Sequence, residues 1–302
     1  MEHTVSVIML TYNRETMLSG MIGDVLSQTY RDFEFIIVDN GATDRSGAIA
    51  EEYAAMDARV RVIHRTRGSI GAGRNTGLDA ARGEYVAFVD DDDRAAPDFL
   101  EFLLKLLTDN DADVAICGSP DRALDEKRVM NAEEALLELL RRERFHTGFP
   151  TKLFRRELLD GLRFSEEGAF EDVGLMYQVL ARASRAAYHG LPKYRARRHP
   201  GNVSAWTTNH ALLTPEILDE YRRAYRARTE WLSARFPDSA AAFRYFEWSF
   251  LLSMVEKIER LNLRDCAAQR EAMAAELSAH RAEFLAAPEL RDFEQEWMGK
   301  YS

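Results

Sequence analysis

The fold is constrained most strongly by an alternation of short apolar runs and helical segments over residues 1–117. The apolar runs are rich in β-branched residues and predict strands at residues 5–10, 33–38, 60–63, 85–89 and 114–117. Helical spacing and helix-start residues predict helices at residues 17–26, 46–55, 73–81 and 97–107. Near-continuous apolar strands that alternate with helices indicate an α/β fold, whose mostly parallel sheet is covered by helices on both faces.

Polar residues follow three of these predicted strands. Residues 11–13 follow the first strand, Asp39 follows the second, and residues 90–93 follow the fourth. Parallel sheets bind their ligands outside the carboxyl ends of the strands. We therefore expect the three segments to line one site.

The last of these segments is a run of four aspartates, residues 90–93. Four adjacent carboxylates repel one another, and Mg²⁺ or Mn²⁺ relieves that repulsion while keeping positions open for substrate phosphates. The alternative is an acidic turn before the helix that starts near Pro97, because Asp is a favourable N-cap residue. The polar ends of the other strands favour the metal site.

The remainder of the chain is mainly helical in pattern. Helices are predicted at residues 132–144 and 173–183, and then at residues 216–236, 240–261 and 265–285. The segment 243–252 is aromatic nearly all round, which predicts burial in the core or in a dimer interface. A membrane-surface role for this helix is less favoured, because its polar face is not strongly basic.

Composition excludes some classes of protein. The net charge of -10 argues against a nucleic-acid partner, because a protein that binds nucleic acid requires a basic face. Two distant cysteines do not make a disulfide framework and favour a reducing compartment. The first residues lack a basic leader, and no apolar stretch reaches the roughly 18 residues that cross a bilayer. We therefore expect a cytoplasmic protein, and peripheral contact with the inner face of the membrane stays open.

Five segments resemble the motifs of family-2-type glycosyltransferases with the GT-A fold. In chain order they are residues 6–14 (SVIMLTYNR), 26–30 (LSQTY), 35–44 (FIIVDNGATD), 73–78 (GRNTGL) and 83–93 (GEYVAFVDDDD). The resemblance is strong over residues 4–120 and weaker to residue 205. It implies a GT-A-type, Rossmann-like sheet with flanking helices, followed here by a helical C-terminal region, and a nucleotide-sugar donor.

The resemblance implies which residues bind the donor. Asp39 would contact uracil, and its carboxylate can accept a hydrogen bond from the imide N–H or from a ribose hydroxyl; the alternative is a turn with Asn40 and Gly41. Tyr12 could stack on the base or pack on the sheet edge, and Arg74 could reach the base or the phosphates or be solvated. The predicted donor-binding residues are Thr11, Tyr12, Asn13, Arg14, Asp39, Arg74, Asp90 and Asp91.

The Asp-x-Asp metal motif of the family corresponds here to Asp90 and Asp92, with Asp91 in the middle position. The implied ion is Mn²⁺ or Mg²⁺, and which adjacent carboxylates touch it is left open. His199 is a further candidate ligand, although a lone His in a basic loop is more often neither a metal ligand nor a phosphate contact.

The second half of the chain carries a candidate general base. The segment 170–173 (FEDV) resembles the Glu-Asp motif of the family, in which the Asp deprotonates the acceptor hydroxyl, so Asp172 is the predicted catalytic residue. The alternative is that Glu171 and Asp172 cap the helix that follows, and the two roles are compatible. Lys152 also matches a family segment, and its role is open.

Three rival functions were weighed. Residues 71–77 (GAGRNTG) approximate a dinucleotide fingerprint, which would make the chain an NAD-dependent oxidoreductase, but these glycines do not directly follow a strand. A nucleotidylyltransferase requires a glycine-rich loop after the first strand, which residues 11–14 do not supply. A non-catalytic nucleotide-sugar-binding relative is disfavoured by the intact metal and Glu-Asp motifs.

These features together predict a metal-dependent glycosyltransferase of the hexosyl or N-acetylhexosaminyl class. The resemblance further implies inversion at the anomeric carbon, a UDP-sugar donor, and a glycan or lipid-linked hydroxyl acceptor in the synthesis of surface or capsular polysaccharide. The predicted domains are residues 1–210, with a donor half (1–120) and an acceptor half (121–210), and a helical region at 211–302. The terminal helices are candidates for a homodimer interface.

Overall fold

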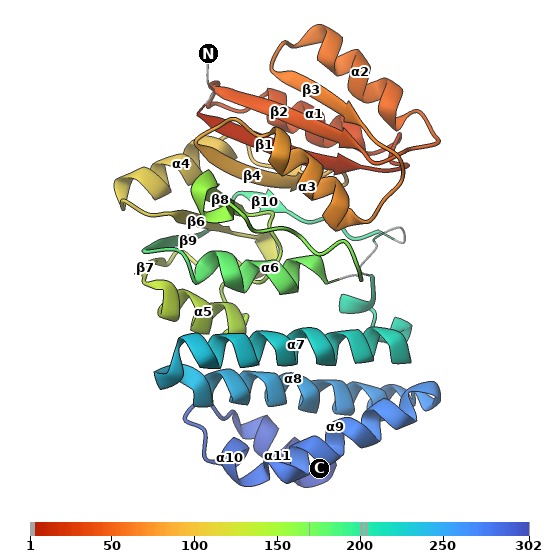
Figure 1. The fold of residues 1–302 in the computed structure, drawn as a ribbon, viewed down its shortest axis with the longest axis vertical. Helices are drawn as coiled ribbons and strands as arrows, with labels where there is room; N and C mark the ends of the chain where they lie inside the picture. The colour runs from red at the N-terminus through yellow and green to blue at the C-terminus, as the bar shows by residue number, and fades with distance from the viewer. Residues whose placement is uncertain (1–3, 169, 200–201, 203–204, 302) are drawn as a thin grey trace. The chain divides into compact units, whose positions relative to one another are not determined.

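The computed structural model describes residues 4–168, 170–199, 202 and 205–301. The chain divides into two compact units, residues 1–197 and residues 198–302. The first unit is an α/β fold and the second is helical (Figure 1). The predicted boundary at residue 210 separates regions by function, and it stays a prediction.

Four parallel strands form the N-terminal part of the sheet. Their order is β3-β2-β1-β4, and all three neighbouring pairs are parallel. Burial is nearly complete along β1, β2 and β4, as expected for strands with helices on both faces. Their bounds are β1 Val5–Thr11, β2 Phe33–Asp39, β3 Val60–His64 and β4 Tyr85–Asp90.

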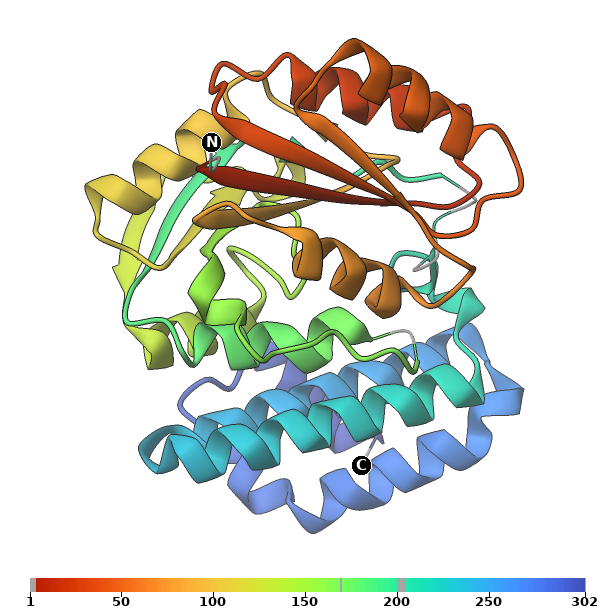
Figure 2. The same cartoon turned by 45° about the horizontal axis from the view of Figure 1, so that its top comes forward.

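Helices cover both faces of these strands. Alternate residues of β1, including Val7 and Met9, join a core cluster with buried residues of α1 (Leu18–Leu26) and α4 (Phe99–Asp109). The intervening residues of β1 meet α3 (Ile70–Ala80), where Gly73 and Gly77 allow the strand to approach closely. Figure 2 shows α1 and α2 (Ser46–Met56) above the strands and α3 below them.

The second half of the sheet departs from the simple alternation that the sequence predicts. Among the described residues the sheet has eight strands, in the order β3-β2-β1-β4-β8-β6-β9-β7. The antiparallel strand β8 lies between β4 and β6, so the predicted fifth strand (114–117, now β6) does not pair with β4. The strands of this half are β6 Val114–Gly118, β7 Lys127–Met130, β8 Lys152–Arg155 and β9 Ala186–Pro192. A separate pair consists of β5 Arg94–Ala95 and β10 Tyr194–Arg195.

Several predicted helix boundaries shift for local reasons. Helix α3 starts at Ile70 rather than residue 73, because the Ser69 hydroxyl accepts a hydrogen bond from Ala72 N (3.1 Å) and caps it. Helix α5 (Ala132–Arg141) stops short of residue 144, since Arg142 adopts a left-handed conformation. Helix α6 spans Glu171–Leu180 and so includes the Glu-Asp motif in its first turn.

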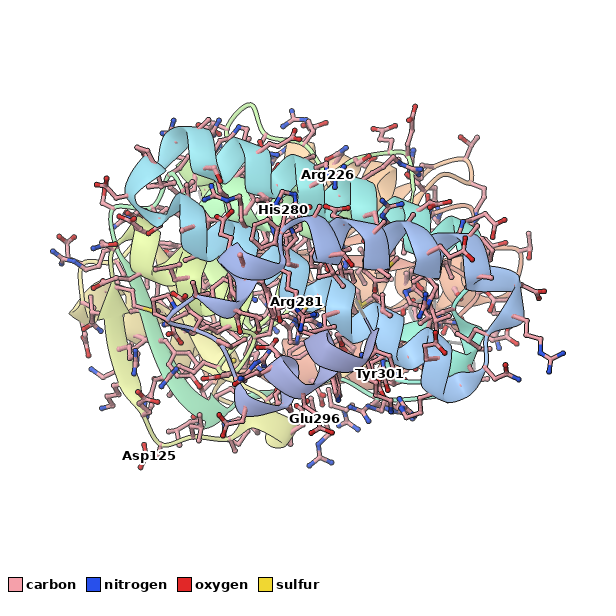
Figure 3. All side chains as sticks on the ribbon, turned by 90° about the horizontal axis from the view of Figure 1, so that it is seen from below. Asp125, Arg226, His280, Arg281, Glu296 and Tyr301 are labelled. Carbon is pink, nitrogen blue, oxygen red and sulfur yellow. The ribbon has the colours of Figure 1, made fainter. Side chains whose placement is uncertain are left out.

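The second unit consists of packed helices. Helix α8 contacts α7, α9 and α11, and its aromatic residues Phe243, Tyr245 and Trp248 are buried, which confirms the predicted burial of this segment. The predicted helix 265–285 is interrupted at His280 and continues as α10; Figure 3 labels His280 and Arg281 at this junction. The bounds are α7 Pro215–Arg235, α8 Ala240–Leu261, α9 Ala267–Ala279, α10 Arg281–Leu285 and α11 Asp292–Tyr301.

Helix α11, which the sequence pattern did not predict, is anchored by a buried carboxylate. Glu294 accepts hydrogen bonds from Tyr245 Oη and Ser249 Oγ (2.5 Å each), both on α8, and from Arg291 (2.6 Å). Short 3₁₀ turns occur at Pro120–Arg122, Arg156–Leu159, Ala205–Thr207, His210–Leu212, Pro237–Ser239 and Arg264–Cys266. Within the described residues, none of the helices combines the length and the apolar character that a bilayer span requires.

Candidate active site

The carboxyl ends of the four parallel strands form one edge. Register pairs Thr11 with Asp39 and Asp39 with His64, and it places Asp90 beside Leu10. The polar segments after β1, β2 and β4 therefore lie side by side, as the sequence pattern predicts. This edge is where a parallel sheet binds its ligands.

The aspartate run turns sharply after β4 and is largely buried. The Arg14 guanidinium lies 3.7 Å from Asp91 Oδ1 and 3.7 Å from Asp92 Oδ2. Burial raises the pKa of Asp91 to about 7, and burial together with the nearby charge of Asp90 raises the pKa of Asp93 to about 8. With Arg14 as the neighbouring cation, Asp91 and Asp93 are thus not fully ionised near neutral pH. Full ionisation would require more positive charge at this turn.

Two further contacts fix this turn. The Asp90 N–H donates a hydrogen bond to the phenol oxygen of the buried Tyr194 (2.9 Å), and Asp93 Oδ1 accepts one from Arg197 N (2.8 Å). The sequence does not indicate Tyr194 as a site residue, because only the pairing of β5 with β10 brings residues 194–195 next to residues 94–95.

The donor chemistry of the turn fits a hard divalent cation. Its oxygens are carboxylates, the ligands that Mg²⁺ and Mn²⁺ prefer, and burial raises the pKa of two of these groups, Asp91 and Asp93. The hydroxyl of Thr11 adjoins Asp91 and favours its ionised form, yet this buried oxygen has no hydrogen-bond partner of normal geometry in the part of the chain that the structure describes. Within the ranges that the structure describes, no three His, Cys, Asp or Glu side chains form a metal-holding cluster.

Arg74 links the two halves of the first unit. Its Nη1 donates hydrogen bonds to Glu171 Oε1 (3.0 Å) and Asp172 Oδ1 (2.5 Å), and its Nη2 donates to Asp90 Oδ1 (3.3 Å). The guanidinium is buried, lies over the ring of Phe164, and has its pKa raised by these carboxylates against the effect of burial. Arg74 is therefore not a solvated helix residue, and it joins β4 to the start of α6.

The two carboxylates of the Glu-Asp motif have different environments. Glu171 is 9% exposed at its side chain, and burial, followed by the charge of Asp172, raises its pKa to about 7. Asp172 is 24% exposed at its side chain. The N-cap position of α6 is Phe170, so Glu171 and Asp172 lie in the first turn of the helix and not at its N-cap. Asp172 is thus the more accessible of the two to a substrate.

Asp39 is held by partners of its own. Its Oδ1 accepts a hydrogen bond from Ala42 N (2.9 Å), and its Oδ2 lies 2.8 Å from His64 Nδ1. A Cβ at Gly47 would lie only 2.6 Å from Asp39 Oδ2, so α2 packs directly on this carboxylate. The structure thus adds His64 to the site, which the sequence did not indicate because only strand register brings it beside Asp39. The predicted uracil contact of Asp39 stays a prediction.

The segment after β1 is tied to the start of α2. Asn13, with a φ of 52°, accepts a hydrogen bond from Thr43 N at its Oδ1 (2.8 Å), and Arg14 N donates to Ser46 Oγ (2.8 Å). The Arg67 guanidinium carbon lies 3.4 Å from the centroid of the Tyr12 ring. One face of Tyr12 is therefore covered by a cation.

Lys152 lies in β8 and is fully buried. Its ammonium group donates to the carbonyl oxygens of His146 (2.9 Å) and Gly148 (2.5 Å). A Cβ at Gly148 would lie 3.9 Å from Asp172 Oδ2, so this loop passes close to the predicted base. His199 belongs to the second unit, where its N–H donates to Asn202 Oδ1 (2.6 Å).

The glycines of the dinucleotide-like sequence have a packing role. Residues 71–77 lie inside α3 and are separated from the end of β3 by residues 65–70, so they form no tight phosphate-binding turn after a strand. Cβ atoms at Gly71, Gly73 and Gly77 would lie 1.9 Å from Ser165 O, 2.2 Å from Leu10 and 2.4 Å from Ile8. This placement argues against the oxidoreductase alternative.

The chain was compared with known proteins. The model of the family described as Glycosyl transferase family 2 matches residues 6–165. An uncharacterized glycosyltransferase, EpsJ of Bacillus subtilis (strain 168), is 36% identical over 215 residues, which are 66% of this chain and 62% of EpsJ. Glycosyltransferase GlyG of Streptococcus pneumoniae serotype 4 is 30% identical over 221 residues, which are 67% of this chain and 73% of GlyG. The match thus spans somewhat less than two thirds of EpsJ.

Solved structures share the fold at low sequence identity. TarS 1-349 of S. aureus, in complex with UDP-GlcNAc, has a TM-score of 0.68 and 20% identity, covering 99% of this chain and 91% of that one. The mannosyltransferase PcManGT of Pyrobaculum calidifontis, in complex with GDP-Man and Mn²⁺, has a TM-score of 0.57 and 20% identity, covering 99% and 84%. The family model spans more than half of the chain and carries its aspartate run, so the chain belongs to glycosyl transferase family 2.

Proposed function

We propose that the chain transfers a sugar from a UDP-sugar to a hydroxyl acceptor, with inversion at the anomeric carbon. The observation that carries this proposal is the position of Arg74, whose buried guanidinium contacts both Asp90 and Asp172. Asp90 is suited to bind the metal of the donor diphosphate, and Asp172 is suited to accept a proton. Both carboxylates thus lie within reach of one side chain. Such proximity is what a transfer between two bound substrates requires.

Asp172 serves as the general base. It accepts the proton of the acceptor hydroxyl while the oxygen forms a bond to the anomeric carbon. The bond from that carbon to the diphosphate breaks, and its electron pair leaves with UDP; the proton then passes from Asp172 to solvent. Attack comes from the face opposite the diphosphate, which gives inversion.

The aspartate turn binds the donor diphosphate. Asp90 and Asp92 would hold Mn²⁺ or Mg²⁺, which neutralises charge on the departing diphosphate. Arg14 pairs with Asp91 and Asp92 and adds a cation at this edge. His199 as a third ligand remains a prediction.

The choice of donor and acceptor rests on the family. TarS and PcManGT were solved with UDP-GlcNAc and with GDP-Man, which supports a nucleotide-sugar donor. We assign residues 1–120 to the donor, 121–210 to the acceptor and 211–302 to presentation of the enzyme to its acceptor or to a second copy. The acceptor would be a glycan or lipid-linked hydroxyl in polysaccharide synthesis, met in the cytoplasm or at the inner face of the membrane.

Calorimetric titration of UDP, with and without Mn²⁺, tests the donor site. We expect micromolar binding that needs the metal and that Asp92→Ala abolishes. Unchanged Mn²⁺-dependent affinity for UDP in Asp92→Ala would overturn the metal assignment. Binding of neither UDP, GDP nor dTDP would overturn the proposed donor.

A second variant tests the base. Asp172→Asn should bind UDP as the parent does but lose sugar transfer by roughly 10²–10⁴-fold, the usual range for a general base. UDP release from donors in the presence of a glycan acceptor panel measures the rate, and Glu167→Gln, an exposed carboxylate nearby in sequence, is the control. Transfer by Asp172→Asn at near the parent rate would exclude this role.

A further inference from the structure

The loop at residues 65–69 is built against the edge that would bind the donor. It follows β3, and Arg65 N donates a hydrogen bond to Asp39 O (3.0 Å), which continues the sheet pairing by one residue. Gly41 has a φ of +78°, and a Cβ there would lie 2.5 Å from Arg67 N. The loop backbone therefore packs directly on the residues that follow β2.

Asn40 fixes the loop with its side chain. Its Nδ2 donates to Gly68 O (2.9 Å), and its Oδ1 accepts from Gly68 N (3.2 Å) and from Arg65 Nη1 (2.8 Å). Asn40 is 1% exposed, so these hydrogen bonds are shielded from water. A loop held at both its start and its end by one buried amide has little freedom to change its path.

The consequence of this clamp is the position of Arg67. Its guanidinium lies 3.4 Å from the centre of the Tyr12 ring, at the end of β1. Arg67 is exposed, and among the described residues it forms no ion pair, whereas Arg14, Arg65 and Arg74 all bond to side chains of the edge. The Arg67 guanidinium thus covers the face of Tyr12 on which a base could otherwise stack. Its own outer face is flat and cationic, and its N–H groups are available as donors.

From these contacts we propose that Arg67 is the residue that contacts the donor's base, with Tyr12 as its support and Asn40 as a positioning residue. The base stacks on the outer face of the guanidinium, which extends the column that Tyr12 begins. A planar guanidinium stacks on π-systems in a way that an ammonium group does not. This inference rests on the proposed nucleotide-sugar donor.

Titrations with three probes test the assignment: UDP, uridine and inorganic pyrophosphate, each with Mn²⁺. Arg67→Ala should weaken UDP and uridine by about tenfold, the size expected for loss of one stacked cation, and leave pyrophosphate unchanged. Arg67→Lys should not restore binding, because it keeps the charge and loses the plane. Arg45→Ala is the matched control, an exposed arginine that pairs with Glu52.

Asn40 variants test the positioning role. Asn40→Ala should weaken UDP and uridine but not pyrophosphate, and should speed deuterium exchange of the amides at residues 65–69. Asn40→Asp keeps the acceptor oxygen for Arg65 and should recover part of the affinity.

The outcomes separate this inference from the proposed function. Unchanged UDP binding in Arg67→Ala, or equal weakening of UDP and pyrophosphate, would overturn the base contact alone. Failure of the parent protein to bind any nucleotide would overturn both. Loss of uridine affinity in Arg67→Ala with pyrophosphate unaffected would support the assignment.

Discussion

Replacing Arg74 by methionine tests the central electrostatic argument. The substitution keeps an unbranched side chain but leaves the buried Glu171 facing Asp172 and Asp90 without a cation. Removing one partner of a buried ion pair costs about 3–5 kcal/mol. The side chains of Asp90 and Asp172 are 42% and 24% exposed and stay partly hydrated, whereas that of Glu171 is 9% exposed. At pH 8 Glu171 in the variant can escape this cost by keeping its proton, which limits its share of the loss to about 1.4 kcal/mol for the one pH unit above the parent pKa. Together with the partly hydrated Asp90 and Asp172, we therefore expect a loss of about 2 kcal/mol at pH 8.

The loss should shrink as the pH falls. The pKa of Glu171 is already raised to about 7 in the parent, above the ordinary value of 4.5, so its ionised form destabilises the fold above that pH. Without Arg74 its pKa rises further, and between pH 7 and that higher pKa the loss relative to the parent falls by about 1.4 kcal/mol for each pH unit. Below about pH 7 Glu171 is protonated in both proteins, so the remaining loss comes from the contacts of Arg74 with Asp90 and Asp172. At pH 5.5 we expect a loss near 1 kcal/mol.

Urea unfolding at both pH values, followed by circular dichroism, measures these losses. Deuterium exchange of the α6 amides localises them to the first unit. Arg45→Met is the control, since Arg45 and Glu52 are 70% and 60% exposed at their side chains and such pairs contribute at most about 1 kcal/mol. A loss in Arg74→Met no larger than in the control at pH 8, or equal losses at the two pH values, would refute the reasoning.

Two further predictions concern stability. Hydrogen bonds with Asp39 and a second carboxylate raise the pKa of His64. The resulting stabilisation of the fold is at most about 1 kcal/mol, because the ring is half exposed, and it is fully present below the ordinary His pKa. It should vanish as the pH rises through the raised value; a stability difference between parent and His64→Leu that is constant from pH 6 to 9 would contradict this. Gly71→Ala should cost about 1–3 kcal/mol in urea unfolding, because its Cβ would meet Ser165 O at 1.9 Å, whereas Gly174→Ala meets nothing within 4 Å and should gain about 0.5–1 kcal/mol. Equal stabilities for the two glycine variants would exclude the close approach at Gly71.

Much of the first unit is predictable because its signals are local. The four parallel strands are short apolar runs, and the residues at their ends must meet at one edge whenever the strands are parallel. Of the later strands, only β6 carries such a signal. Strand β8 is four residues long and begins with the buried Lys152, a residue that sequence patterns assign to solvent.

The partners of the site residues were not predictable in the same way. Arg74 and Asp172 are in contact although they lie 98 positions apart in the chain. His64 meets Asp39 because of the strand register. Sequence patterns identify residue types at strand ends, whereas the pairing of their charges follows from packing. The interruption at His280 has a similar cause, since the His280 ring stacks on Trp248 with ring centroids 4.6 Å apart.

The division of the chain after Arg197 also partitions its chromophores. All four tryptophans, at positions 206, 231, 248 and 297, belong to the second unit, and the first unit has none. Tryptophan emission of the unlabelled protein therefore reports on the helical unit alone, while circular dichroism reports on both. Denaturation recorded by both signals would reveal whether the α/β unit and the helical unit melt in one cooperative transition or in two.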